Sequence, residues 1–373
     1  MKIGLDSRTL TVEGGSRTYA YNLIAEIINN HKDIELVLFG GDKIQNNLPI
    51  NPSPQKEYLR LIWENLSILP YINKERLDIF HGLKNVAPYY KNANTKSIIT
   101  VHDIMPLLFP SMLPLKTQIY WKLIRLNIKK ADKIIAVSNT TKEDIIDKLN
   151  IENSKISVIY HGVSEQFRPI PDIEKEKKKY HLKYGLTFSD NSIVIMAVSS
   201  IKPTKNYVNL IEAFRRVYEE LDVPIHLLIV GKVADKKLIL NLNKIISNNN
   251  LSSNVHFLGY VPDEELTVLY NLVDFFVFPS FYEGFGLPIL EAQACGCPVI
   301  TSNISSMPEV AGGGAILVDP YSVEEIANAI HNLVFDLNLR KNLIQKGFEN
   351  CALFSWKRCA EETLNVYKEV YSE

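Results

Sequence analysis

The chain has 373 residues, of which 46% are hydrophobic and 22% are charged, a balance typical of a globular protein with a full core. That length predicts two domains, or three. The 41 basic and 42 acidic residues leave a net charge of −1, which argues against a dedicated nucleic-acid-binding protein, because such proteins are clearly basic.

The four cysteines do not show the spacing of a metal site. Cys295 and Cys297 are closer together than zinc ligands usually are, and Cys351 and Cys359 lie well beyond them. Free thiols are expected in a reducing compartment. The chain enters a strand at once, without an apolar signal segment, and it has no run of 18 apolar residues. The expected location is therefore the cytoplasm.

The first predicted elements form a βαβ unit. Residues 2–6 and 34–39 read as strands, and 16–29 as the helix between them. This order is typical of nucleotide-binding folds, but the turn before the helix lacks the Gly-x-Gly-x-x-Gly pattern, so a dinucleotide cofactor is disfavoured. Gly14 and Gly15 are either plain turn residues or points where the backbone comes close to a diphosphate.

A helix over 57–69 and strands over 77–80 and 97–101 are expected next. The second of these strands ends in His102-Asp103. Polar residues at the carboxyl end of a parallel strand are where α/β proteins bind ligands. His102 is either a histidine satisfied in the core or a group that donates to a sugar hydroxyl or stabilises charge.

The segment 105–115 is apolar and broken by prolines, and the helix expected over 116–130 is basic. Such a helix lies on a membrane surface, holds a lipid-linked acceptor, or simply has one buried and one solvated face. Its five basic residues are Lys116, Lys122, Arg125, Lys129 and Lys130.

The first half closes with a strand over 133–137, a helix over 139–150 opened by Ser138, and a strand over 156–159. The chain then becomes charged and rich in proline, as linkers are. The predicted domains are 1–168 and 185–355, joined by a linker over 169–184, with the helix 356–373 added to the first domain.

The second half repeats this plan. A loop containing Ser200 and Lys205 follows the strand 193–198 and leads into the helix 207–220. Lys205 is either a solvated surface lysine or an ammonium group that joins the helix end in holding phosphate. Further strands are expected over 225–230, 255–258, 274–278 and 315–318, and further helices over 235–248, 263–272, 322–335, 339–351 and from about residue 355.

The stretch 274–301 reads as strand, loop, helix and strand. Pro288 suits the first position of a helix expected over 289–295, and Gly296 is its natural stop. That places Glu283 on the loop and Glu291 in the first turn of the helix.

The backbone N–H groups of Phe285, Gly286 and Leu287 are then expected at a positive helix end, which suits a phosphate. Two carboxylates beside a phosphate site suit a sugar nucleotide, because carboxylates accept hydrogen bonds from sugar hydroxyls. Alternatively, Glu291 caps its helix and Glu283 is a solvated loop acid.

These residues, in order and spacing, resemble the family 4 retaining glycosyltransferases of the GT-B fold over nearly the whole chain. The matching motifs are Gly14-Gly15, VHDIMPLLFP at 101–110, Ser138, HGV at 161–163, KPTKN at 202–206, HFLGYVPDEEL at 256–266, EGFGLPILEAQACGCPVI at 283–300, SSMPEVAGGGAILVDP at 305–320 and SW at 355–356. The resemblance implies two Rossmann-like α/β/α domains facing each other across a cleft, with the last helix crossing back to the N-terminal domain.

The resemblance also implies roles. The C-terminal half is expected to bind a nucleotide-diphosphate sugar and the N-terminal half a glycan or lipid-linked acceptor. Glu283 is expected at the donor-sugar hydroxyls, Glu291 at the ribose and Lys205 at the diphosphate. His102 is expected near the transferred sugar, and the region 259–261 beside the base. The expected catalytic residues are His102, Lys205 and Glu283, and the expected substrate-binding residues are Gly14, Gly15, Asp103, Ser200, Lys205, Gly259, Tyr260, Val261, Glu283, Phe285, Gly286, Leu287 and Glu291. No metal and no cofactor besides the donor substrate are expected.

The chain departs from the family in its phosphate loop. Many members carry an arginine at places matching Ser200 and Thr204 here, so Lys202, Arg8 and Arg17 are candidates for a second phosphate-binding cation.

In its details the match looks most like bacterial mannosyltransferases that build O-antigen or exopolysaccharide from GDP-mannose. We therefore expect metal-independent sugar transfer with retention, with peripheral contact to the inner membrane through 105–130. The alternatives are another nucleotide-sugar donor, a sugar-nucleotide epimerase, or a non-catalytic nucleotide-sugar-binding protein.

Overall fold

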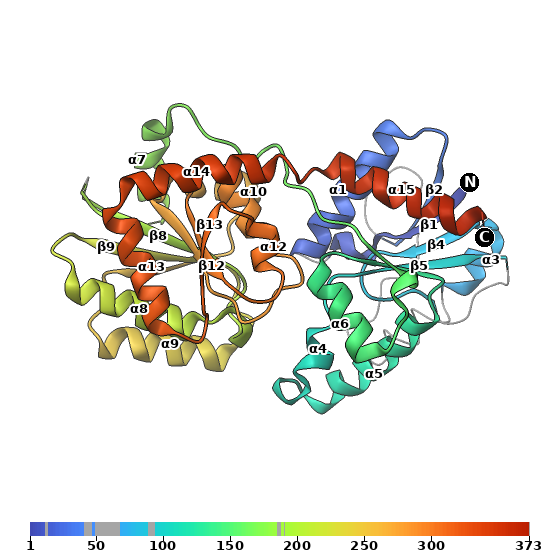
Figure 1. Ribbon diagram of the computed structural model, residues 1–373, viewed down its shortest axis with the longest axis horizontal. Coiled ribbons are helices and arrows are strands. Elements are labelled where there is room, and N and C mark those ends of the chain that lie inside the picture. Colours follow the sequence, from blue (N-terminus) through green and yellow to red (C-terminus); the bar gives the residue numbers. More distant parts are fainter. Residues whose placement is uncertain are drawn as a thin grey trace. The chain divides into compact units, whose positions relative to one another are not determined.

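The structure is a computed structural model that describes residues 1–11, 14–40, 47–48, 68–88, 94–184, 188–189 and 191–372. The chain divides into two compact units (Figure 1). The first unit is Met1–Gly162 with Phe354–Glu373, and the second is Val163–Leu353. The helix expected over 57–69 falls almost wholly outside the described residues.

Within the described residues, the first unit contains a seven-stranded parallel sheet in the order β3-β2-β1-β4-β5-β6-β7. The strand order reverses between β1 and β4, and doubly wound sheets bind ligands at such a switch point. The strands are β1 (Lys2–Asp6), β2 (Glu35–Phe39), β3 (Asn47–Leu48), β4 (Ile79–Gly82), β5 (Lys96–Val101), β6 (Lys133–Ala136) and β7 (Ile156–Val158).

Helices cover both faces of this sheet, with α1 and α15 on one face and α5 and α6 on the other (Figure 1). Ile124 and Ile128 of α5 and Ile145 of α6 are buried in one cluster with strand residues such as Ile99 and Ile134. Each such side chain stabilises the fold by about 2 kcal/mol. The helical elements are η1 (Ser7–Thr11), α1 (Gly15–Asn30), α3 (Leu69–Glu75), α4 (Met105–Leu108), η3 (Pro110–Met112), α5 (Leu115–Lys130), α6 (Asn139–Leu149), η4 (Asn153–Lys155) and α15 (Trp356–Ser372).

The last helix, α15, belongs to the first unit, which confirms the expected return of the chain. Its Tyr367 hydroxyl lies 2.6 Å from Nδ1 of His81 in β4, and Glu369 pairs with Lys133 of β6 at 2.6 Å. Because α15 also buries apolar side chains such as Leu364, it is part of the first core.

The second unit has a six-stranded parallel sheet among its described residues, in the order β10-β9-β8-β11-β12-β13. Its switch point lies between β8 and β11. The strands are β8 (Ile193–Val198), β9 (Ile225–Val230), β10 (Val255–Gly259), β11 (Phe275–Phe278), β12 (Val299–Ser302) and β13 (Ala315–Val318).

The helices of this unit also lie on both faces of its sheet, α8 and α13 on one and α10 and α14 on the other (Figure 1). Apolar residues of α8 such as Phe214 pack with Ile330 of α13 and Ile195 of β8. The helical elements are α7 (Ile173–Tyr184), η5 (Pro203–Lys205), α8 (Tyr207–Glu220), α9 (Lys236–Asn248), α10 (Asp263–Leu272), α11 (Leu287–Ala294), α12 (Met307–Ala311), α13 (Val323–Phe335) and α14 (Leu337–Cys351).

The linker expected over 169–184 is wrong for most of its length, because α7 occupies it and belongs to the second unit. Its charged residues form ion pairs one helical turn apart, such as Lys179 with Glu176. The Tyr184 hydroxyl donates to Glu265 of α10 at 2.6 Å, which ties the helix to its unit. No helix in the described parts of the chain is long and apolar enough to cross a membrane.

Candidate active site

The loop between β11 and α11 carries Glu283. Gly286 precedes the helix with a φ of +112°, a left-handed conformation that a side chain would strain. Because α11 begins at Leu287, Pro288 takes the second helical position rather than the first. Glu283 is on the loop as expected, but Glu291 lies in the second turn of the helix, not in the first.

The loop after β8, which ends in η5, is bonded to this loop. The Phe281 backbone N–H donates to the Thr204 carbonyl at 2.9 Å, and Asn206 Nδ2 donates to the Pro279 carbonyl at 3.0 Å. Both loops follow the carboxyl ends of β8 and β11, the strands between which the order reverses. The strand order thus places both loops at the switch point, where doubly wound sheets bind ligands.

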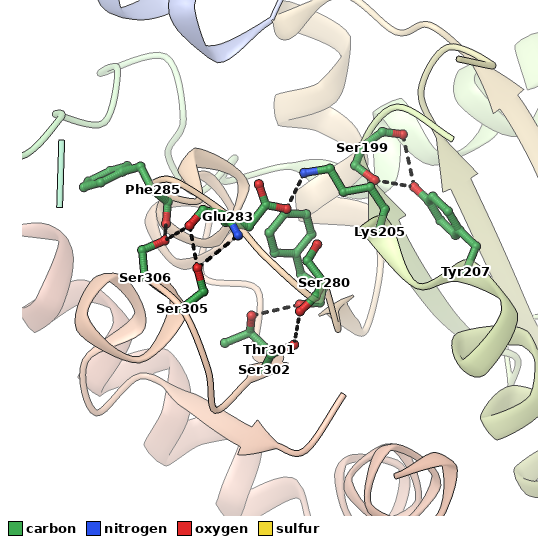
Figure 2. Close-up of polar contacts among 11 residues, drawn as sticks. Ser199, Lys205, Tyr207, Ser280, Glu283, Phe285, Thr301, Ser302, Ser305 and Ser306 are labelled. Atoms are coloured by element: carbon green, nitrogen blue, oxygen red, sulfur yellow. Dashed lines mark hydrogen bonds and ion pairs between the residues drawn. The ribbon is translucent and has the colours of Figure 1, made fainter. Parts of the chain in front are cut away.

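Lys205 and Glu283 form an ion pair between these two loops (Figure 2). Their side chains are only 10% and 14% exposed, and the Lys205 ammonium lies 5.4 Å from the centroid of the Phe278 ring. The negative ring face attracts the ammonium as well. Both residues were expected at the site, but 78 residues separate them, and their direct contact was not expected.

Ser305 and Ser306 hold the backbone of the Glu283 loop from the other side, and neither was expected to have a role. The hydroxyls of Ser305 and Ser306 lie 2.6 and 2.9 Å from the Glu283 carbonyl (Figure 2). A sequence signal existed in the Ser-Ser pair after β12, but only the structure shows where the hydroxyls point.

Glu291 is half-buried beside Tyr270, whose hydroxyl lies 3.3 Å from Glu291 Oε2. Burial, and then the charge of Asp263, raise the pKa of the Glu291 carboxyl to about 8. The carboxyl is therefore largely protonated at neutral pH and can donate to a hydroxyl as well as accept from one.

The three residues expected beside the base, 259–261, lie at the end of β10, and Gly259 is the last residue of that strand. Gly259 has a φ of +70° and open space where a side chain would project. Tyr260 is 48% exposed, and the Lys232 ammonium lies 4.8 Å from its ring centroid. Val261 is buried. Tyr260 is thus the residue of the three with an aromatic surface open to a ligand.

The candidates for a second phosphate-binding cation differ in their surroundings. The Arg8 guanidinium is ion-paired with Asp6, and its Nε lies 2.6 Å from that carboxylate. Arg17 is exposed on α1. Lys202 and Ser200 are half-buried in the loop that leads to η5, where Lys202 immediately precedes the turn.

In the first unit, Gly14 and Gly15 open α1. Gly14 has a φ of +121°, no atom lies within 4 Å of where its Cβ would be, and both glycines are exposed. This open helix start satisfies the geometric requirement for close approach of an anion.

His102 follows β5, with its Nε2 2.9 Å from the Leu83 carbonyl. Because a carbonyl only accepts, Nε2 carries the proton and Nδ1 is left as the acceptor. Burial lowers the pKa of His102 to about 4, so the ring is neutral. A neutral His102 in this geometry can accept a hydrogen bond at Nδ1 but cannot donate one from that atom. Asp103 accepts from the Met105 N–H at 3.0 Å and so shapes the turn into α4.

A cluster of rings surrounds His102, and sequence reasoning missed it. Tyr19 of α1 contacts the His102 ring edge-on, with centroids 5.1 Å apart, and stacks on His161 at 4.9 Å. His161 stacks in turn on Trp356 of α15 at 5.6 Å. The helix that begins at Gly15 and the last helix therefore both fix the position of His102.

The predicted residues divide between the units. His102, Asp103, Gly14 and Gly15 belong to the first unit, as do the candidate cations Arg8 and Arg17, and the remaining ones belong to the second. In the second unit, one loop pair brings a cation and a carboxylate together beside a helix N-terminus. Such a group can hold a diphosphate and accept hydrogen bonds from sugar hydroxyls.

Two family models match the chain, one in each half. The model described as Glycosyltransferase Family 4 matches residues 13–167, and the model described as Glycosyl transferases group 1 matches residues 181–350.

Curated relatives and solved structures agree with these matches. The O-antigen chain mannosyltransferase B of Escherichia coli is 31% identical over 78% of this chain and 74% of its own length. The serotype-specific mannosyltransferase WbdA of the same species is 30% identical over 72% of this chain, which spans about a third (33%) of that longer protein. A sucrose-phosphate synthase structure from Thermosynechococcus elongatus has a TM-score of 0.81 at 20% identity, covering 100% of this chain and 99% of its own. The chain belongs to the family 4 glycosyltransferases of the GT-B fold.

Proposed function

We propose that this protein transfers mannose from GDP-mannose to a glycan or lipid-linked acceptor in surface-polysaccharide synthesis, with retention at the anomeric carbon. The observation that carries the proposal is the Lys205–Glu283 pair beside the start of α11. The choice of mannose and of a polysaccharide acceptor rests on the relatives, which are named as O-antigen and serotype-specific mannosyltransferases.

In the proposed complex, Lys205 and the N–H groups at the start of α11 contact the diphosphate. They stabilise the negative charge that grows on the leaving group as the glycosidic bond breaks, so no metal is required for that role. Glu283 accepts from hydroxyls of the sugar, Glu291 binds the ribose, and Tyr260 lies against the base.

Retention follows if the acceptor hydroxyl attacks from the side on which the diphosphate departs. A phosphate oxygen of the leaving group then takes the proton of that hydroxyl. In this scheme Glu283 is a ligand of the sugar hydroxyls and not a nucleophile, so no glycosyl-enzyme forms. His102 Nδ1 accepts from a hydroxyl of the transferred sugar, which orients the ring.

The test combines binding and transfer. Purified protein is screened by thermal shift against GDP-, UDP-, ADP- and dTDP-sugars, and the stabilising donor is then incubated with lipid-linked glycan from a reconstituted pathway. We expect stabilisation by GDP-mannose, a product with the anomeric configuration of the donor, and activity that persists in EDTA. Stabilisation only by a UDP-sugar overturns the mannose assignment, and binding with no transfer to any acceptor favours a non-catalytic binder.

We also propose that α5 rests on an anionic membrane surface at the cytoplasmic face. Its outward side carries four exposed aliphatic residues, spaced three or four apart so that they share one helix face. They are Leu115 (71% exposed), Ile119 (52%), Leu123 (43%) and Leu126 (46%).

Five basic residues and no acidic residue occur in α5. A helix that pairs an aliphatic strip with positive charge binds the headgroup region of anionic bilayers, at about 1 kcal/mol per basic residue near the surface. The test is co-sedimentation with vesicles of phosphatidylcholine alone or with added phosphatidylglycerol. Ile119→Asp should abolish binding to the anionic vesicles, while Leu240→Asp, at a 69% exposed position of α9, should not. Equal loss in both variants, or no binding by the wild type, rejects the contact.

A further inference from the structure

The backbone of the Glu283 loop is bonded to a turn that precedes α12. Ser305 Oγ donates to the Glu283 carbonyl at 2.6 Å, and the Glu283 N–H donates back to Ser305 Oγ at 3.2 Å. One hydroxyl thus occupies both backbone polar groups of the same residue, Glu283. The carboxylate of Glu283 remains directed at Lys205 (Figure 2).

Ser306 adds a second attachment further along the loop. Its hydroxyl lies 2.9 Å from the Glu283 carbonyl and 2.7 Å from the Phe285 carbonyl. The single hydroxyl proton is therefore shared between two acceptors that bracket Gly284. Phe285 is the residue just before Gly286, so this bond fixes the entry to α11.

The backbone conformation of Ser305 and the missing side-chain cap of Ser306 both cost stability, which indicates that their contacts with the Glu283 loop are important. Ser305 has a φ of +57°, a left-handed conformation that residues with a side chain rarely adopt. Ser306 stands at the N-cap of α12, where serine ordinarily bonds to its own helix, yet its hydroxyl makes no such cap. It is fully buried and bonds to the Glu283 loop instead.

We propose that Ser305 and Ser306 are positioning residues of the donor site. They set the backbone from Glu283 to Phe285, and with it the direction of the Glu283 carboxylate and of the N–H groups that begin α11. This inference rests on the proposed function, since it assigns these groups to the sugar and the diphosphate. Neither serine is assigned a contact with substrate.

The alternative is that the serines serve only the stability of the fold. Three variants separate the two roles. Ser305→Gly removes both hydrogen bonds but accepts the left-handed backbone freely, so its Tm should stay close to that of the wild type. Ser306→Ala removes the shared hydroxyl, and Ser306→Thr restores it.

Ser302→Ala is the matched control. Ser302 is also buried, as the last residue of β12, and its hydroxyl donates to the carbonyl of Ser280 at 2.7 Å and not to residues 283–285. Any general cost of deleting a buried serine hydroxyl at this edge of the sheet appears in this variant too.

The readouts are Tm, kcat and KM for the donor, and amide hydrogen exchange over 281–287. We expect Ser305→Gly and Ser306→Ala to lower kcat about tenfold, which corresponds to about 1.4 kcal/mol of transition-state stabilisation, and to speed exchange in the loop. We expect Ser306→Thr to recover most of kcat. We expect Ser302→Ala to change neither kcat nor hydrogen exchange in the loop.

Two failures are distinguishable. If the wild type transfers sugar and the serine variants keep kcat and loop exchange at the level of Ser302→Ala, the positioning role is wrong and the proposed function stands. If loop exchange rises in the serine variants but the wild type transfers no sugar from any donor, the proposed function fails and the catalytic part of this inference falls with it.

Discussion

The Lys205 ammonium and the Glu283 carboxylate form an ion pair at the switch point of the second sheet. In the proposed donor complex, Lys205 contacts the diphosphate and Glu283 contacts the sugar. A diphosphate that binds Lys205 competes with Glu283 for the same ammonium. Binding of the diphosphate then releases Glu283 to accept from the sugar.

A double-mutant cycle on this pair tests the competition. Glu283→Gln should bind GDP about tenfold more tightly than the wild type, because Lys205 no longer has to break an ion pair before it binds the diphosphate. In a Lys205→Met background the same substitution should leave GDP affinity unchanged. Calorimetric titration of the four proteins measures the coupling; an equal gain in both backgrounds shows simple repulsion between Glu283 and phosphate instead.

The same pair predicts a pattern of stability. Lys205→Met alone leaves a nearly buried carboxylate without this partner, and we expect a loss of about 3 kcal/mol in the free energy of unfolding. Lys205→Met with Glu283→Gln should recover part of that loss. Urea unfolding measures this, and a double variant less stable than Lys205→Met contradicts the role of the pair.

Glu291 makes stability depend on pH. Its folded pKa of about 8 lies above the ordinary value of 4.5, so the folded state holds this proton more tightly than the unfolded state does. The stabilisation is complete below pH 4.5 and is lost as pH rises to about 8. We therefore expect Glu291→Gln to gain Tm relative to the wild type across this range and to hold a constant advantage above it. A Tm difference that does not change with pH contradicts the raised pKa.

Three histidines of the first unit, two of them buried and His102 half-buried, give it the opposite dependence. Burial lowers the pKa of His81 to about 3, that of His102 to about 4, and that of His161 well below its ordinary 6.5. Unfolding lets each take up a proton at acid pH, so their stabilisation is present above pH 6.5 and is lost as pH falls toward 4 and 3.

We expect the first unit to lose stability as pH falls from 6.5 toward 4 during acid titration, as followed by hydrogen exchange. His226, whose pKa burial lowers to about 4, adds the same dependence to the second unit. His81→Gln should flatten the slope of stability against pH between 6.5 and 4, whereas His331→Gln, at an exposed position, should not. An unchanged slope in His81→Gln refutes the assignment.

Gly286 is expected to be intolerant of a side chain. A Cβ at its φ of +112° is strained, and it would also lie 3.1 Å from Ile289 Cδ1. Gly286→Ala should lose about 2 kcal/mol of stability and, by turning the N–H groups at the start of α11, weaken GDP binding. Gly313→Ala is the control, because its Cβ would meet only Lys346 Cδ at 3.7 Å. Equal Tm for the two variants would falsify the strain argument.

The alternation of apolar runs with amphipathic segments was enough to predict both α/β units, because parallel strands and their covering helices have distinct periods in the sequence. The loop position of Glu283 followed from Gly286 and Pro288 for the same local reason. The charged run 175–179 was predicted to be part of a linker but lies in α7. A solvated helix face with ion pairs such as that of Glu176 and Lys179 has the same composition as a linker.

What the sequence did not predict depends on contacts between distant segments. Lys205 meets Glu283, and Ser305 meets the Glu283 backbone, only because neighbouring strands of the sheet end at the same edge. The tautomer of His102 likewise depends on the Leu83 carbonyl, which no spacing rule places beside it.

The hydrogen bond between His81 and Tyr367 has a consequence for the order in which the protein folds during synthesis. The first unit contains the earliest segment of the chain and also α15, which leaves the ribosome after the whole second unit. Since domains ordinarily fold in the order of their synthesis, the second unit is free to fold on emergence while the first waits with Tyr19 and His81 uncovered by α15. The nascent chain thus keeps the core of the first unit exposed for longer than the core of the second. A stop codon that removes α15 should therefore yield a product that aggregates rather than a shorter enzyme.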